Sequence, residues 1–248
     1  MARNKRIKSE TGIYHVMLRG INQQQVFYDK EDSYKFINIL SKVKAISGFK
    51  LYAYCLMGNH VHILIQEGTE PLDLVFKRLG DRYIYWYNLK YKRSGPLFQG
   101  RYKSMPINDD AYFISALRYI HQNPVKAGLT KNCKDYQFSS YSEYFKSMSI
   151  VDKEFPMELI GENQFESIHN TPCLDHHLEI KEQAYSLITD EEAMRIIERI
   201  SKCKNTADFQ RLPADIQMAH ISTLKKKHLS ERQISRLTGV SRYIIRNN

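Results

Sequence analysis

Residues 51–65 read LYAYCLMGNHVHILI, and this stretch decides the fold class of the chain. Its halves, 51–56 and 61–65, are rich in aromatic and β-branched residues, which favour β-strands. Met57-Gly58-Asn59 between them is a turn signal, and so short a connection favours antiparallel pairing. The sequence therefore predicts a β-hairpin, and its second strand carries two histidines.

The segments on either side of this hairpin alternate between strand and helix patterns. The predicted elements are strands over 13–19 and 97–107 and helices over 31–47, 72–92 and 110–123. The last helix is expected to end near Asn123, because Pro124 disfavours helical geometry in the residue before it. The order β-α-β-β-α-β-α predicts an α+β fold with a ferredoxin-like or RRM-like antiparallel sheet and helices on one face.

The remaining chain divides into an irregular and a helical part. We predict a catalytic domain over 1–150, a linker over 151–182, which contains Thr171-Pro172, and an all-α region over 183–248. Within that region, 229–247 fits a helix-turn-helix. A terminal helical hairpin that only packs on its neighbours fits the same pattern.

In the helix-turn-helix interpretation, Ser230 and Ser241 cap the two helices. Arg242, Tyr243 and Arg246 then lie on the exposed recognition helix, where they can contact double-stranded DNA.

The composition is that of a globular protein with one or two domains: 248 residues, 42% of them hydrophobic and 26% charged. No stretch approaches the ~20 apolar residues of a membrane span, and the basic amino terminus lacks the apolar core of a signal peptide. We therefore expect a cytoplasmic protein with no membrane partner. Its four cysteines form no Cys-x-x-Cys pair, which argues against a zinc ribbon or a disulfide framework.

The formal net charge of +10 is unevenly distributed. Residues 1–150 carry 23 basic and 12 acidic side chains, 151–210 carry 6 and 13, and 211–248 carry 8 and 2. A basic protein with abundant aromatic residues, here 17 Tyr and 11 Phe, is typical of proteins that neutralise phosphates and stack bases. A basic surface that serves only solubility has the same composition.

Two residues apart on a strand, His60 and His62 point to the same face, and this spacing suits one divalent metal ion. The pair fits core hydrogen bonding equally well. On the helix over 110–123, Tyr119 and Asn123 are one turn apart on one face. A metal held by both histidines and the Asn123 oxygen can position a phosphodiester in line with Tyr119, whereas core packing also accounts for a tyrosine here.

These motifs resemble a known family. The stretch 58–65, GNHVHILI, is similar to the His-hydrophobic-His (HUH) motif of single-tyrosine transposases, also called IS200-like transposases. The stretch 119–129, YIHQNPVKAGL, resembles the tyrosine helix of their REP-associated branch. The segments 14–20 and 95–102 are also similar to family segments, so the resemblance spans roughly residues 10–145.

The resemblance implies a metal-dependent endonuclease and strand transferase that acts on single-stranded DNA. Tyr119 is then the nucleophile that forms a 5′-phosphotyrosine link. His60, His62 and Asn123 are the ligands of Mg²⁺ or Mn²⁺, although the wider family has Gln or a comparable polar residue where Asn123 stands. It also implies recognition of hairpin DNA by a monomer or a homodimer.

Basic residues near these motifs are candidates for DNA contacts. They are Arg19, Lys92, Arg93, Arg101 and Lys103. Two alternative functions stay open. One is a nucleic-acid-binding regulator without catalysis, and the other is a metal-dependent hydrolase in which the histidines activate water.

Overall fold

The structure is a computed structural model that describes residues 6–171, 190–203, 205–227, 229 and 231–246. The chain forms two compact units, Met1–Ile180 and Lys181–Asn248. The first unit contains a sheet with helices, and the second is helical in its described part.

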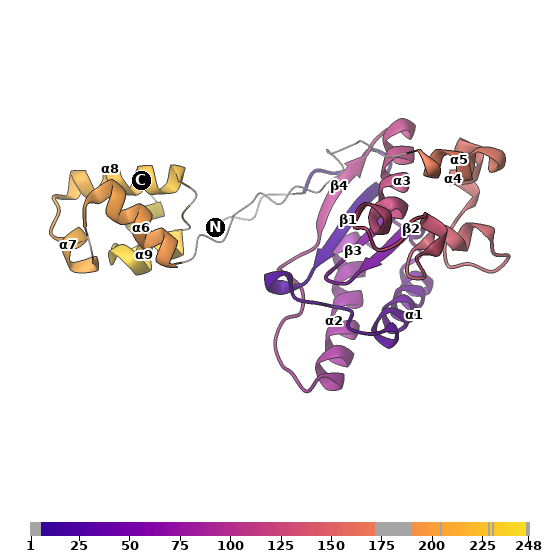
Figure 1. The fold of residues 1–248 in the computed structure, drawn as a ribbon, viewed down its shortest axis with the longest axis horizontal. Helices are drawn as coiled ribbons and strands as arrows, with labels where there is room; N and C mark the ends of the chain where they lie inside the picture. Colours follow the sequence, from indigo (N-terminus) through magenta and orange to yellow (C-terminus); the bar gives the residue numbers. More distant parts are fainter. Residues whose placement is uncertain (1–5, 172–189, 204, 228, 230, 247–248) are drawn as a thin grey trace. The chain divides into compact units, whose positions relative to one another are not determined.

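One four-stranded sheet forms the centre of the first unit. Its strands are β1 (Ile13–Arg19), β2 (Lys50–Met57), β3 (His60–Gln66) and β4 (Lys103–Ile107). They lie in the order β2-β3-β1-β4, and every neighbouring pair is antiparallel (Figure 1). The predicted α+β class and the predicted hairpin are confirmed. Because only Gly58 and Asn59 connect β2 to β3, these two strands can pair only in the antiparallel direction.

Two helices follow β1 and β3, as the periodicity predicted: α1 (Lys30–Ser47) and α2 (Leu72–Lys90). The Asp29 side chain accepts a hydrogen bond from the Asp32 backbone amide, and the Asp32 side chain accepts one from the Asp29 amide. This capping box begins α1. Gly48 ends α1 in the left-handed conformation, with φ of 62°. These caps fix the ends of the helix that packs against α2.

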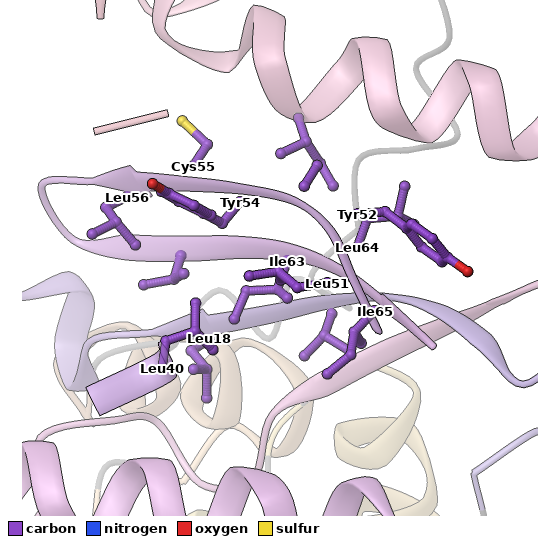
Figure 2. Packing of buried hydrophobic residues seen from close by; sticks show 14 of the residues in the cluster. Leu18, Leu40, Leu51, Tyr52, Tyr54, Cys55, Leu56, Ile63, Leu64 and Ile65 are labelled. Atoms are coloured by element: carbon purple, nitrogen blue, oxygen red, sulfur yellow. The ribbon is translucent and has the colours of Figure 1, made fainter. Parts of the chain in front are cut away.

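The helices do not all lie on one face of the sheet. Figure 2 shows Leu18 of β1 beside Leu40 of α1, while Cys55 points to the opposite face. The third helix, α3 (Asp110–Lys126), lies on that opposite face, because its Tyr119 contacts His15, whose side chain alternates with that of Leu18. The prediction of helices on one face is therefore right for α1 and α2 and wrong for α3.

Two predicted elements differ in length. The strand expected over 97–107 is regular only from Lys103, and before it Phe98 forms a single bridge with Gly20. The helix expected to end near Asn123 continues through Pro124 to Lys126. Proline removes one donor but its backbone angle is compatible with a helix, and the Ala127 amide closes the next turn on the Asn123 carbonyl at 2.9 Å.

The segment expected to be an irregular linker is ordered as far as it is described. It forms α4 (Glu154–Ile160), a 3-10 turn (Glu162–Gln164) and α5 (Phe165–Asn170). Ile160 and Phe165 are buried in the main core of the first unit. The linker prediction is wrong there, because a few large apolar side chains suffice to dock short helices on an existing core. Residues 172–182 lie outside the described residues.

Short 3-10 segments connect the main elements of the first unit. They are η1 (Ile21–Gln23), η2 (Cys133–Asp135) and η3 (Ser140–Phe145). Cys55 and Cys133 are buried free thiols in this unit.

The described part of the second unit is a small helical bundle. Its helices are α6 (Asp190–Ser201), α7 (Thr206–Gln210), α8 (Ala214–Lys226), α9 (Glu231–Thr238) and α10 (Arg242–Arg246). Ile197, Phe209 and Ile234 are among the side chains of its own buried core. Gly239, with φ of 72°, lies between α9 and α10, and the Ser241 hydroxyl accepts a bond from the Ile244 amide at 3.4 Å. The other predicted cap, Ser230, lies outside the described residues.

No helix in the described ranges has both the length and the apolar character that crossing a bilayer requires.

Candidate active site

The two histidines of β3 lie side by side. Their ring centroids are 5.0 Å apart with the planes nearly perpendicular. His62 is buried, and His60, at the turn end of the strand, is partly exposed. The neighbouring strand β1 runs antiparallel, so Arg19 is paired with His60. One imidazole is thus reachable from solvent, and the second lies behind it.

Helix α3 brings the predicted nucleophile to this pair. The Tyr119 ring centroid lies 5.6 Å from that of His62, with an interplanar angle of 84°. Tyr119 is 6% exposed and Asn123 is 9% exposed, so both belong to a nearly closed site. The Asn123 Nδ2 donates to the Tyr119 carbonyl at 3.0 Å. The structure therefore gathers His62 and Tyr119, which are 57 positions apart in the sequence, in one place.

A third histidine, to which the sequence assigned no function, belongs to the same cluster. The Nε2 of His15 lies 2.9 Å from the Nδ1 of His62, and both rings are buried. The His15 ring centroid is also 5.7 Å from that of Tyr119. The sequence gives only a weak signal for a role of His15 in this site. Its side chain lies on the same face of β1 as that of Arg19, but only the pairing of β1 with β3 brings it to His62.

Burial keeps these imidazoles neutral. It lowers the pKa of His15 to about 3 and, together with the nearby charge of Arg19, that of His60 to about 4. Burial also lowers the pKa of His62 well below its ordinary value, with contributions from His15, His60 and Arg19. A metal binds the unprotonated form of an imidazole, and both β3 histidines are in this form at neutral pH.

A hydrogen bond to Asn59 determines which ring nitrogen of His60 carries the proton. The His60 Nδ1 lies 2.7 Å from the Asn59 Oδ1, and because an amide oxygen only accepts, the Nδ1 carries the proton. The Nε2 of His60 then has the free electron pair that a metal requires. This arrangement of a ligand with a hydrogen-bonded partner behind it fits a metal site.

The described residues contain no group of three or more His, Cys, Asp and Glu side chains that could hold a metal ion. A third ligand drawn from the described residues would therefore be of another type. The Asn123 amide uses its nitrogen for the bond to the Tyr119 carbonyl, which leaves its oxygen available as an electron-pair donor. The donor set of two imidazoles and one amide oxygen fits a divalent metal that keeps open positions for phosphate oxygens.

Of the predicted basic residues, Arg19 lies nearest to the histidines. Lys92, Arg93, Arg101 and Lys103 belong to the connection after α2 or to the first residue of β4, and Arg101 and Lys103 are exposed. Another cation was missed: the Lys126 Nζ lies 4.6 Å from the Tyr119 ring centroid. Arg242, Tyr243 and Arg246 are exposed on α10, within the second unit.

Comparison with known families agrees with this site. Residues 8–123 match the model of the IS200-like transposases. The match overlaps the segment that carries the motifs, so the resemblance inferred from them is confirmed for that part of the chain.

One relative and one solved structure are similar to parts of this chain. A protein of Haemophilus influenzae Rd described as a REP-associated tyrosine transposase is 31% identical over 111 residues, which are 40% of this chain and 62% of the relative. The chain therefore matches less than two thirds of that relative's length. The solved structure of a REP-associated tyrosine transposase bound to a REP hairpin superimposes with a TM-score of 0.51. It is 18% identical and covers 61% of this chain and 94% of that one, a likeness that concerns the fold.

Proposed function

We propose that this protein is a metal-dependent endonuclease and strand transferase for single-stranded DNA that acts through a 5′-phosphotyrosine intermediate. The observation that carries the proposal is the 5.6 Å separation between the ring centroids of Tyr119 and His62, which supports a tyrosine nucleophile next to a metal-binding histidine. A transposase family suits this chemistry, because transposition requires DNA strands to be cut and rejoined. The antiparallel strand order β2-β3-β1-β4 supports the ferredoxin-like or RRM-like interpretation of the sheet.

Tyr119 is the proposed nucleophile. Its phenol oxygen attacks the scissile phosphorus, the bond from phosphorus to the 3′ oxygen breaks, and the phenol proton leaves to solvent. The departing 3′ oxygen takes up a proton, which leaves a free 3′-hydroxyl and a 5′-phosphotyrosine link. The Lys126 ammonium 4.6 Å from the ring stabilises the negative charge that builds on the phenol oxygen. Attack of a 3′-hydroxyl on the link reverses the step and rejoins DNA.

His60, His62 and Asn123 would hold the divalent ion. When bound, Mg²⁺ or Mn²⁺ withdraws electrons from the phosphate and orients it. The two imidazoles shift the preference of this site toward Mn²⁺, since Mg²⁺ favours an all-oxygen shell. Burial of His62 and Tyr119 excludes water from the phosphodiester, which favours attack by the tyrosine.

The DNA partner is proposed to be a hairpin with a single-stranded flank. The likeness to a protein whose structure holds a REP hairpin supports it, as does the excess of basic residues in 1–150. We assign the backbone contacts to Arg19, Lys92, Arg93, Arg101 and Lys103. In the second unit, the exposed Arg242, Tyr243 and Arg246 on α10 are proposed to grip double-stranded DNA as a helix-turn-helix does.

The test is a search for the covalent intermediate. Purified protein is incubated with labelled single-stranded DNA from both flanks of its gene, with Mn²⁺ or EDTA, and the products are separated on a denaturing gel. We expect the protein to become linked to the 5′ end of the downstream fragment, in a product that requires Mn²⁺ and is lost in Tyr119→Phe and His60→Ala. Tyr112→Phe is the matched control, because it removes the same hydroxyl from the same helix.

Other outcomes favour the alternatives. A water-activating hydrolase would cleave DNA without an adduct and would keep its activity in Tyr119→Phe. Binding of the flanking DNA with no adduct, and DNA-dependent activities unchanged in Tyr119→Phe, would indicate a regulator and contradict the proposal.

A further inference from the structure

His15 has no role in the mechanism above, although it touches the metal-binding pair. Its Nε2 is 2.9 Å from the Nδ1 of His62, and its side chain is fully buried. The contact comes from the register of two antiparallel strands, in which His62 lies opposite Met17 and its ring leans toward His15. A buried polar side chain in direct contact with a ligand is well placed to control that ligand.

The contact constrains which nitrogen of each ring carries a proton. A neutral imidazole has one N–H, and a hydrogen bond between two of them uses one ring as donor and the other as acceptor. If His15 donates from Nε2, the proton of His62 lies on its Nε2, where it blocks a metal. If His62 donates from Nδ1, its Nε2 keeps the electron pair that coordination requires.

We propose that His15 is a positioning residue that accepts the Nδ1 proton of His62 and so turns the Nε2 electron pair of His62 toward the divalent metal. This inference rests on the proposed function, because it concerns the same metal. It adds a residue that the motif does not contain, from a strand 47 positions earlier in the chain.

The surroundings of His15 add a second consequence. Its Nδ1 is buried and has no hydrogen-bond partner among the described residues. When His62 donates, the proton of His15 lies on this nitrogen, and an unpaired buried donor costs free energy. In the opposite tautomer, in which His15 donates, the same nitrogen is an unpaired acceptor, so neither tautomer pairs it.

The first test measures Mn²⁺ affinity by electron paramagnetic resonance of the free ion, without DNA. We expect His15→Phe, which keeps an aromatic ring but has no acceptor, to weaken binding about 10- to 100-fold, the usual effect of losing a ligand's hydrogen-bond partner. His15→Gln places an amide oxygen near the position of Nε2, so it is expected to restore most of the affinity. Met17→Leu, an apolar change on the same strand face, is the control and leaves the affinity unchanged.

The second test needs no substitution. Long-range ¹H–¹⁵N NMR of the full chain reports which histidine nitrogens are protonated, and we expect the proton of His62 on Nδ1 with saturating Mg²⁺. Mg²⁺-loaded protein with the proton of His62 on Nε2 would overturn the inference, as would Mn²⁺ affinity unchanged in a folded His15→Phe.

The two proposals fail differently. If His60→Ala weakens Mn²⁺ binding and His15→Phe does not, only the inference about His15 is wrong. If wild-type protein binds Mn²⁺ no better than His60→Ala, the metal site itself is absent and both are wrong.

Discussion

The side-chain nitrogen of Asn123 lies 3.0 Å from the carbonyl oxygen of Tyr119, one turn earlier on α3. This bond fixes which end of the amide faces the helix and which end remains for other partners. Because the nitrogen is occupied, the oxygen is the end that can act as a ligand. Tyr119 and Asn123 therefore form one unit, held by the helix backbone on which both lie.

Substitution of Asn123 tests whether its side-chain oxygen is a metal ligand. Asn123→Asp keeps an oxygen and adds a negative charge, so we expect Mn²⁺ affinity at least equal to that of the wild type. Asn123→Leu, of similar volume, removes the oxygen and is expected to weaken Mn²⁺ binding about 10-fold or more. Titration of both variants with Mn²⁺ checks this, and equal affinity in the leucine variant would remove Asn123 from the ligand set.

A second pair of buried histidines should make stability depend on pH. His121 Nδ1 lies 2.9 Å from His169 Nε2, and His121 also bonds the Ser140 hydroxyl at 2.9 Å. Burial lowers the pKa of His169 to about 4 and that of His121 well below its ordinary value. Below pH ~6.5 the unfolded chain therefore binds more protons than the native one, so stability falls on acidification.

We expect the free energy of unfolding to drop by about 2 kcal/mol between pH 7 and pH 5 for each such histidine. Urea titrations at several pH values measure this. His121→Leu should reduce the pH dependence, whereas Ser140→Ala breaks the same hydrogen bond without removing a titrating group and should keep it. An equal pH slope in wild type and His121→Leu would show that this histidine is not the cause.

The ion pair between Lys90 and Asp32 is expected to matter for stability. Their N–O distance is 2.8 Å, and the Asp32 side chain is fully buried at the start of α1. Lys90→Met leaves this carboxylate without its cation, so we expect a loss of about 3 kcal/mol. Lys77→Met is the matched control, because the Lys77–Asp81 pair is exposed and should cost less than about 0.5 kcal/mol. Similar urea midpoints for the two variants would contradict this.

Arg101 is expected to contribute to DNA affinity but not to metal binding. Replacing this exposed side chain with Gln should weaken hairpin binding and reduce the slope of log affinity against log salt by about 1, as for the loss of one phosphate contact. Lys50→Gln removes the same charge at the opposite end of the sheet from His60, and it should leave the hairpin affinity and the salt slope unchanged. Fluorescence anisotropy at several salt concentrations measures the effect, and equal slopes would exclude Arg101 from the interface.

Much of the first unit could be predicted from local pattern. The strand over 13–19, the hairpin turn and the starts of α1, α2 and α3 follow from residue preferences, caps and periodicity, which act over a few residues. The prediction failed where packing outweighs local preference. Phe165 docks a segment that looks irregular, and α3 continues beyond Pro124.

The sequence by itself determined the spacing of His60 and His62 on one strand and of Tyr119 and Asn123 on one helix, because strand and helix geometry set which neighbours share a face. Only the tertiary structure decided that these two elements meet, since no local rule links β3 to α3. It also brought His15 to His62, because that contact depends on the pairing and register of β1 and β3. Strand register is set by the burial of a whole sheet face, a property of the folded chain and not of any short segment.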